Sequence, residues 1–303
     1  MSYKYYIYGL NVESEIEIEE AYKLDFDGEP DVRVVYGDMP AQVMEMYADK
    51  GQDEYCSAIA ANSLFFRIPN TCEYCVEKDV ITIHPFENAV NSDIKCFILG
   101  SSFGYCMILR RMVVLHGGAV SKNGKGVIVT GESGAGKSTV SDALLSDGYL
   151  FVADDVCALS DLGNKTHINM AYPQQKLCKD AALKKGYDLS QLIYIDEERD
   201  KYAIRLKDGY LKDGIDFDYL FELVLTDEKE VSFRQVSGHE KLMLIMRNIF
   251  RGEGGFAYWG VPPEYMKMCL KVASSIQVYQ IARPKDADTL DEIVQFIEKT
   301  VEE

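Results

Sequence analysis

The residues from Gly131 to Thr139, with the sequence GESGAGKST, match the pattern G-x-x-x-x-G-K-[ST] in full. An apolar run precedes them and a helix-compatible segment follows, which is the arrangement of a strand, a glycine-rich turn and a helix. Gly131, Gly134 and Gly136 allow a tight turn whose backbone N–H groups point inward, and the helix adds the positive end of its dipole. Such groups bind phosphate, so the sequence predicts a site for a nucleoside triphosphate.

The side chains at the end of this loop have expected roles in binding. Lys137 would reach the outer phosphates, and Ser138 would hold a magnesium ion. The alternative, a glycine- and serine-rich turn with a chance lysine, is disfavoured because both flanking elements fit. The predicted ligands are therefore ATP and Mg²⁺. The predicted nucleotide-binding residues are Gly131, Glu132, Ser133, Gly134, Ala135, Gly136, Lys137, Ser138 and Thr139.

Two adjacent acids, Asp154 and Asp155, follow the apolar run Tyr149–Ala153, which is predicted to be a buried parallel strand. Ligands of open α/β sheets bind at the carboxyl ends of the strands, so this pair should face the phosphate loop. One carboxylate could hold Mg²⁺, while the other accepts a proton from an attacking hydroxyl. Neighbouring side chains of a strand point to opposite faces, so one acid could be purely structural. A solvated strand end is the alternative for both.

A histidine precedes the loop in a strand-like run. This run and the next are joined through Asn123-Gly124, residues that tolerate the positive φ angles of a type I′ turn. If the turn has two residues, the register places His116 opposite Gly131, at the entrance of the phosphate loop. There the imidazole could orient a carboxylate or influence its pKa. An ordinary polar residue at a strand end is the alternative.

Further candidates are arginines that could clamp a transferring phosphate in the transition state. One of them, Arg251, begins a glycine-rich segment that extends to Gly255 and is expected to be flexible enough to close over a ligand. A surface charge is the alternative interpretation for each. These arginines are Arg205, Arg247, Arg251 and Arg283.

Composition limits the classes of partner. The formal net charge of −17 opposes binding to nucleic acid or to an anionic membrane, because neutralising phosphate needs an excess of Lys and Arg. No secretory signal is recognisable at the start of the chain, and the apolar stretch Ile94–Leu109 is interrupted by Lys95. The eight cysteines are then expected to be reduced thiols, and the chain cytoplasmic. Cys72 and Cys75 have the spacing of a zinc or redox pair but lack a second pair, which favours ordinary thiols.

The hydrophobic periodicity changes along the chain. Up to residue 92 it is typical of short strands, including the alternating run Ile16–Glu19, and a buried helix is predicted over residues 92–112. Tyr219–Leu225 and Val231–Val236 are predicted to be an antiparallel pair, and Ser237–Glu240 a capping box that opens a helix. We therefore predict an α/β fold with α+β character at the N-terminus. The predicted domains are a β-rich unit over 1–92 and a phosphate-loop catalytic unit over 93–303.

The order and spacing of these motifs over residues 112–160 carry a resemblance. Leu115-His116-Gly117, the Asn123-Gly124 hairpin, the loop and the segment Gly148–Asp155 together resemble the catalytic domain of HPr kinase/phosphorylase. That family consists of bacterial serine protein kinases whose fold is related to phosphoenolpyruvate carboxykinase. The resemblance implies a P-loop kinase core of this type, ATP and Mg²⁺ as cofactors, and a reaction that can also run in reverse as a phosphorylase.

The same resemblance assigns roles to residues. It implies that Asp154 is the proton acceptor for the substrate hydroxyl, while Asp155 and His116 support the metal and the catalytic acid. Together with Lys137 these are the predicted catalytic residues, and Ser138 and Asp155 are the predicted metal ligands.

Other segments resemble a subgroup of HPr-kinase-like proteins that accompany peptide-maturation systems, including kinases of lasso-peptide precursors. These segments are Tyr8-Gly9-Leu10, Ser14-Glu15-Ile16 and the stretch from Tyr172-Pro173 to Lys176-Leu177. The family's later Ile-Arg-Gly-Leu-Gly-like run, which engages the target protein, is not recognisable, and this leaves the acceptor open.

The expected function is transfer of the γ-phosphoryl group of ATP to a serine-type hydroxyl of a peptide or protein. A kinase for a small metabolite is one alternative, and a nucleotide-gated binding module with weak ATPase activity is another. The complete acid pair argues against the last, because a pure sensor needs no base. The expected partners are thus a nucleoside triphosphate and a hydroxyl acceptor, with no nucleic acid and no membrane. The oligomeric state stays open, with a homo-oligomer as one option.

Overall fold

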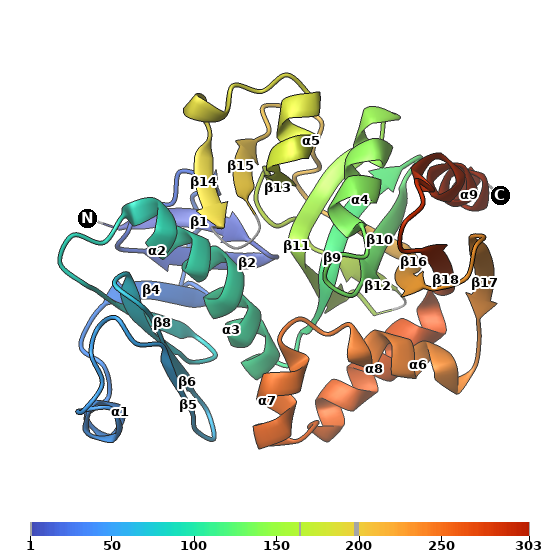
Figure 1. Cartoon of the computed structure of the whole chain (residues 1–303). Coiled ribbons are helices and arrows are strands. Elements are labelled where there is room, and N and C mark those ends of the chain that lie inside the picture. Colours follow the sequence, from blue (N-terminus) through green and yellow to red (C-terminus); the bar gives the residue numbers. More distant parts are fainter. Residues whose placement is uncertain (1, 164, 197–199, 303) are drawn as a thin grey trace.

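Two large β-sheets lie side by side in the protein, and a small third sheet lies near the junction between them (Figure 1). This computed structural model describes residues 2–163, 165–196 and 200–302. The strands of the large sheets pair in both parallel and antiparallel directions, and helices pack on the sheets. The fold is therefore of the mixed α/β class, as the sequence predicted.

The N-terminal sheet has eight strands, and a short helix, α1 (Ala41–Met46), lies at its end. The short strand runs predicted around residues 31–36, 63–68, 73–77 and 80–84 are all present, with bounds that differ by one or two residues. In sheet order the strands are β3 (Tyr22–Lys23), β1 (Tyr3–Ile7), β2 (Leu10–Ser14), β4 (Val32–Tyr36), β8 (Val80–Pro85), β7 (Cys72–Val76), β6 (Leu64–Ile68) and β5 (Cys56–Ile59).

The alternating run Ile16–Glu19 is not a strand. Ile16 and Ile18 are buried, but side chains satisfy their backbone N–H groups in place of a neighbouring strand. Ser14 Oγ accepts from Ile16 N at 3.2 Å, and the Tyr5 hydroxyl accepts from Ile18 N at 2.8 Å. The alternation of apolar and polar residues over this run reflects the alternate burial of side chains in an irregular segment. The same alternation occurs in a strand, so the sequence pattern cannot distinguish the two.

A continuous helical segment leads from the first sheet to the second. It consists of α2 (Asn91–Phe97), a π-helical turn over Ile98–Ser102 and α3 (Phe103–Leu109), close to the predicted helix. Length and composition alone would allow Asn91–Leu109 to cross a membrane, with a mean hydropathy of 1.2, but 67% of that window is buried inside the protein. A helix buried in a protein core can have the length and hydropathy of a membrane-spanning helix.

The second sheet has seven strands and carries the phosphate loop. Because β16 pairs with both β12 and β10, five of its strands form a closed ring, and β18 and β17 extend from β16. Its strands are β9 (Val113–Lys122), β10 (Lys125–Gly131), β11 (Leu150–Asp161), β12 (Thr166–Ile168), β16 (Ile215–Thr226), β17 (Ser232–Val236) and β18 (Gln277–Pro284). The helices of this part are α4 (Lys137–Ser146), α6 (His239–Arg247), α7 (Gly252–Trp259), α8 (Pro263–Ser275) and α9 (Leu290–Glu302).

Strand β11 differs from the predicted parallel strand over Tyr149–Ala153. It pairs antiparallel with both of its neighbours, β9 and β12. The crossover through α4 does return the chain in the direction of β10, but β9 of the preceding hairpin lies between β10 and β11. β11 also continues through Asp154 and Asp155 to Asp161, so the acidic pair lies within the strand and not at its end.

Two local predictions near β17 are also wrong. β16 and β17 do not pair with each other, because β18 lies between them, parallel to β16 and antiparallel to β17. β17 is largely exposed and suits an edge, whereas β18 has buried Val278 and Ile281 and takes the interior place. The predicted capping box is absent as well: Gly238 is the N-cap of α6, and the carboxylate of Glu240 pairs with Arg234 instead.

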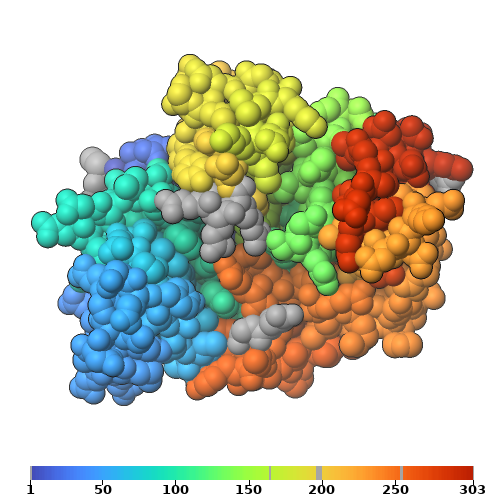
Figure 2. Space-filling view, viewed as in Figure 1, coloured from blue at the N-terminus to red at the C-terminus, as the bar shows by residue number. Residues whose placement is uncertain are grey.

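The third sheet covers one side of the phosphate-loop sheet, and its strand β13 packs against β11. In the space-filling view the yellow part of the chain, which carries β13 and α5, lies between the N-terminal part and the green phosphate-loop part (Figure 2). The elements are β13 (Gln174–Cys178), β15 (Lys201–Arg205), β14 (Ile193–Asp196), α5 (Lys179–Lys184) and a 3₁₀ turn over Leu189–Gln191.

The predicted division between residues 92 and 93 falls within α2. The largest hydrophobic core contains residues of the N-terminal sheet, such as Tyr5 and Val34, together with Ile128 and Leu220 of the second sheet. A core shared in this way ties the two parts together, and the division into two domains stays a prediction.

Candidate active site

The phosphate loop has the backbone geometry that its glycines predicted. Gly131, Gly134 and Gly136 have φ angles of 137°, 85° and 102°, a region that side chains rarely adopt. A Cβ atom at Gly131 would lie 2.3 Å from the carbonyl oxygen of Leu223, and one at Gly136 would lie 2.7 Å from Arg283 Nη1. The chain then enters α4 at Lys137. This glycine cradle at a helix N-terminus fits a phosphate group.

A cavity of about 410 Å³ lies beside this loop. Most of the predicted site residues line it, whereas Gly131, Glu132 and Ala135 are not among its lining residues. The Lys137 ammonium donates hydrogen bonds to the carbonyl oxygens of Gly131 and Glu132, at 2.9 and 3.0 Å. The lining residues are His116, Gly117, Gly118, Ser133, Gly134, Gly136, Lys137, Ser138, Thr139, Asp154, Asp155, Lys176, Cys178 and Lys201.

The register predicted for the β9–β10 hairpin is confirmed. Lys122 pairs with Lys125, and the ladder continues to Gly117 opposite Thr130. Asn123 and Gly124 have φ angles of 54° and 77°, as a type I′ turn requires. The ladder therefore brings His116 to the cavity at the point where β10 ends and the phosphate loop begins.

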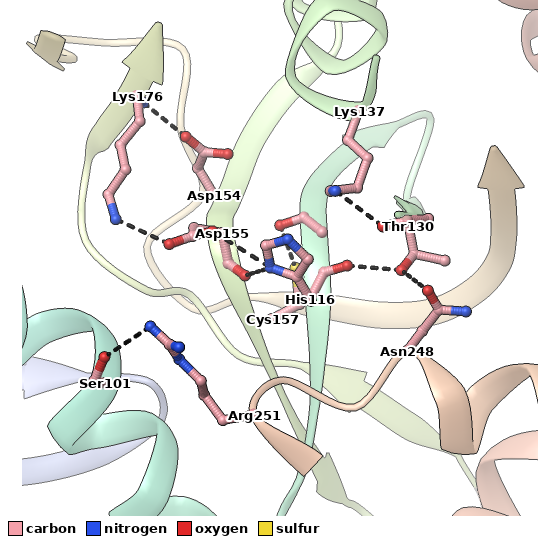
Figure 3. Close-up of polar contacts among 12 residues, drawn as sticks. Ser101, His116, Thr130, Lys137, Asp154, Asp155, Cys157, Lys176, Asn248 and Arg251 are labelled. Carbon is pink, nitrogen blue, oxygen red and sulfur yellow. Dashed lines mark hydrogen bonds and ion pairs between the residues drawn. The ribbon is translucent and has the colours of Figure 1, made fainter. Parts of the chain in front are cut away.

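Both acids of the predicted pair line the same cavity, contrary to the expectation that they point to opposite faces. The reason is the backbone of Asp155, which has a φ angle of 69° in the middle of β11. A left-handed residue breaks the alternation of a strand, so consecutive side chains can project to one side. Figure 3 shows Asp155 beside His116 and the carboxylate of Asp154 next to the backbone nitrogen of Lys176.

Lys176 is a site residue that no motif in the sequence indicated. Its backbone N–H donates to Asp154 Oδ2 at 2.7 Å, and its ammonium lies 3.0 Å from Asp155 Oδ2 (Figure 3). The side chain of Lys176 is only 12% exposed. A lone lysine in the run Gln174–Cys178 has no spacing relation to the acids, and only the packing of β13 against β11 brings it there.

Burial and neighbouring charges separate the two acids. Burial, and then the charge of Asp155, raises the pKa of Asp154 from 3.8 to about 6. Burial would also raise the pKa of Asp155, but the Lys176 ammonium and His116 hold that pKa well below its usual range. Burial would lower the pKa of Lys176, but the Asp155 carboxylate holds it well above its usual value. Lys176 and Asp155 thus form a stable ion pair, and Asp154 titrates near neutrality.

The His116 imidazole contacts Asp155 through one ring nitrogen. Nδ1 lies 3.1 Å from the carbonyl oxygen of Asp155 and 3.4 Å from its Oδ1. Since both partners are acceptors, this nitrogen carries the proton. Burial lowers the pKa of His116, and the charge of Asp155 offsets this only in part, so the ring is neutral at pH 7.

None of the arginines proposed as phosphate clamps is among the described residues that line the cavity. Arg247 pairs with the buried Glu222, and Arg283 donates to the loop carbonyl of Ala135 at 3.3 Å from behind the loop. Arg251 directs its guanidinium toward Ser101 (Figure 3). Arg205 is exposed on β15. The segment after Arg251 is the helix α7 and not a flexible loop.

The described part of the chain contains no group of three or more His, Cys, Asp or Glu side chains that could hold a metal ion. Cys72 and Cys75 lie in different hydrophobic clusters, so they cannot share a metal. At the cavity, Ser138 and Asp155 supply oxygen atoms of the type that Mg²⁺ prefers, so these two residues would suit a magnesium ion as ligands.

The region that contains the active-site residues is similar to known proteins. Residues 108–178 match the family model of the HPr Serine kinase C-terminal domain, and this stretch contains His116, the phosphate loop, the acid pair and Lys176. This part of the chain is HPr kinase-like. The similarity supports the resemblance that the motifs indicated, and it also covers the lysine that those motifs did not.

Curated relatives are similar over short stretches. "Putative HPr kinase/phosphorylase 2" of Oceanobacillus iheyensis is 41% identical over 54 residues, which are 18% of each chain. "HPr kinase/phosphorylase" of Mycoplasmopsis pulmonis is 29% identical over 122 residues, 38% of each chain. The matched stretches thus span well under half of the curated relatives. A solved structure, the "Hpr(Ser) kinase/phosphatase from Coxiella burnetii", is 17% identical and covers 62% of this chain and 93% of that one, with a TM-score of 0.32 that supports no inference.

Proposed function

We propose that this HPr kinase-like protein is a phosphotransferase that moves the γ-phosphoryl group of ATP to a serine-type hydroxyl of a peptide or protein, in the cytoplasm. The observation that carries the proposal is the position of Asp154. Its carboxylate shares a cavity with the phosphate loop, and its pKa of about 6 suits a base that works near neutral pH.

The loop and Lys137 would bind the phosphates of ATP, and this fixes the γ-phosphorus within the cavity. The acceptor oxygen attacks that phosphorus, a new P–O bond forms, and the bond to the bridging oxygen of ADP breaks. Asp154 takes the hydroxyl proton. In the reverse direction the protonated Asp154 would return that proton to the acceptor oxygen.

Asp155 would be the acid of the pair that stays ionised during the reaction. The Lys176 ammonium holds Asp155 ionised, and the Nδ1–H of the neutral His116 orients it. Asp155 and Ser138 would hold Mg²⁺, which supplies positive charge to the phosphate oxygens when it is bound. The negative charge of a permanently ionised Asp155 also contributes to the raised pKa of Asp154.

Lys201 of β15 is the candidate for the cation that contacts the transferring phosphate, a role for which the sequence had indicated an arginine. Lys201 lines the cavity, and its positive charge lowers the pKa of Asp154 and the pKa of Asp155. Lys137 is already assigned to the phosphates of ATP, and Lys176 is paired with the Asp155 carboxylate. We therefore propose that Lys201 faces the transferring phosphoryl group.

The proposed function can be tested with γ-labelled ATP, Mg²⁺ and native cell extract. The wild-type protein should label a peptide or protein, and Lys137→Ala should abolish the labelling. Lys285→Ala is the matched control, because Lys285 is half exposed, pairs with Asp227 and is not among the described residues that line the cavity. Label in a small molecule would indicate a metabolite kinase. Release of ADP without a labelled acceptor would indicate a nucleotide-gated module, and absence of ATP turnover would contradict both kinase proposals.

The pH dependence of the reaction should follow Asp154. This carboxyl must be ionised to accept a proton, so kcat/KM should fall about tenfold per pH unit below an apparent pKa of about 6. The pKa values of Asp155 and His116 are both lowered, so neither group should add a titration above pH 6.5. Initial rates between pH 5 and 8 measure this limb, and a rate that stays constant down to pH 5 would exclude Asp154 as the base.

A further inference from the structure

The segment Asn248–Phe250 takes the place of β10 beside β9 beyond the end of β10. The chain leaves the sheet at Gly131 to form the phosphate loop, and β9 extends further in that direction. There the His116 N–H donates to the carbonyl oxygen of Asn248 at 2.8 Å, and the Phe250 N–H donates to that of Val114 at 2.8 Å. This segment follows α6 directly, so it connects that helix to the strand carrying His116.

The side chain of Asn248 contacts the residue that precedes the loop. Asn248 Oδ1 lies 3.0 Å from Thr130 Oγ1, and the same hydroxyl lies 2.7 Å from the carbonyl oxygen of His116 (Figure 3). Thr130 is fully buried. Its single hydroxyl proton is shared between these two acceptors, so one hydroxyl joins the start of the loop, the His116 backbone and Asn248.

A buried carboxylate fixes which way the Asn248 amide points. Asn248 Nδ2 donates to Glu222 Oε1 at 2.7 Å and to the carbonyl oxygen of Leu244 at 2.9 Å. Both partners are acceptors, so the amide nitrogen must face them, and Oδ1 must face Thr130. Glu222 is only 3% exposed, and further donors from Arg247 and Gln280 hold it in place.

Aromatic packing fixes His116 from the same segment. The Phe250 ring lies 5.9 Å from the imidazole of His116, at an angle of 43°. On α3, a Cβ at Gly104 would lie 2.6 Å from this ring, so Phe250 is held closely between α3 and His116. The contacts of Asn248 and Phe250 therefore reach both the backbone and the side chain of His116.

We propose that Asn248 is a positioning residue of the active site. Through the Thr130 hydroxyl and the His116 backbone, it holds the first residues of the phosphate loop in register with the histidine beside Asp155. The proposal deepens the kinase function proposed above and rests on it, since the geometry being held is that of the nucleotide site. A merely structural role would make Asn248 important for stability while leaving nucleotide affinity in the folded protein unchanged.

The test uses Thr130→Val, Thr130→Ser, Asn248→Ala and the double variant Thr130→Val/Asn248→Ala in the full chain. Thr130→Val and Asn248→Ala should each weaken the binding of a fluorescent ATP analogue with Mg²⁺ about tenfold, because a buried polar partner is lost. Thr130→Ser keeps the hydroxyl and should bind as the wild type does. The double variant should be about as weak as the weaker single variant, not a hundredfold weaker, because both changes break one linkage.

A second measurement does not depend on nucleotide. Hydrogen exchange of the amides in residues 131–139 should be faster in Asn248→Ala and Thr130→Val than in the wild type. Glu240→Gln is the control, because it breaks an exposed ion pair at the start of α6 and should change neither quantity. Unchanged affinity, or loop exchange equal to that of the wild type, would overturn the positioning role. If the wild type bound no ATP, the kinase proposal would fail, and loop exchange would still decide the role of Asn248.

Discussion

Asp154→Asn should abolish phosphoryl transfer and at the same time make the protein more stable at neutral pH. An amide cannot accept the hydroxyl proton, and loss of a general base typically lowers the rate about 10²- to 10⁴-fold. The amide oxygen can still accept from the Lys176 N–H, so the fold and the phosphate loop should be retained. ATP binding should therefore survive the loss of transfer.

The gain in stability follows from the raised pKa of Asp154. This carboxyl has a pKa of about 6 in the folded protein against 3.8 as the reference value, so the folded state binds more protons between these pH values. Ionised Asp154 thus costs stability, by about 1 to 2 kcal/mol after allowance for its partial exposure. The advantage of Asn should be absent below pH 4, grow as the pH rises toward 6, and be complete above it.

Thermal unfolding of both proteins at pH 4, 6 and 8, together with the labelled-ATP assay, measures the two effects. Asp208→Asn makes the same charge change at an exposed position and should alter neither activity nor this pH pattern. Transfer at the wild-type rate by Asp154→Asn would show that another group is the base. A loss of stability at pH 8 would contradict the raised pKa.

Lys176→Met should destabilise the protein strongly. It should also raise the pH below which kcat/KM falls. The side chain is 12% exposed, and its ammonium lies 3.0 Å from Asp155 Oδ2. Removal of one partner of a buried ion pair costs about 3 to 5 kcal/mol, because the other charge stays buried and unpaired. The Lys176 charge also lowers the pKa of Asp154, so this pKa should rise above 6 without it.

The loss of stability in Lys176→Met should depend on pH. The lowered pKa of Asp155 stabilises the folded protein above the unfolded pKa of about 3.9, and this contribution disappears as the pH falls through the folded pKa. Lys176→Met removes it and leaves the buried Asp155 carboxylate without its counter-charge, so burial should then raise its pKa above the usual value. The deficit should therefore be larger at pH 7, where this carboxylate is ionised, than at pH 4, where it can be protonated. Urea unfolding at these pH values measures the deficit. Lys179→Met, at a lysine that is 48% exposed, is the matched control, and equal losses for the two variants would contradict the buried ion pair.

Several features of the site could be predicted because they depend on neighbours in the sequence. The phosphate loop needs glycines at fixed positions between a strand and a helix, and all of them lie within Gly131–Thr139. The register of His116 follows from a two-residue turn, since pairing in a hairpin is set by the turn that closes it. Local chemistry therefore determined the cradle and the histidine at its entrance.

Other features were decided by contacts between distant segments. The antiparallel pairing of β11 depended on β9 lying between it and β10, and the common orientation of the acids depended on the positive φ angle of Asp155. No pattern of residue types specifies either of these, because a strand periodicity describes burial and not the identity of the neighbouring strand.

The sequence by itself determined the phosphate loop, the hairpin and the presence of two acids after the helix. The tertiary structure alone decided that Lys176 completes the acid pair and that Asn248 joins the loop to His116, across separations of 21 to 118 residues along the chain. The physical reason is that charge pairing and hydrogen bonding act through space. A buried lysine next to two carboxylates is a property of how β13 packs on β11, and it has no signature in the local sequence of either strand.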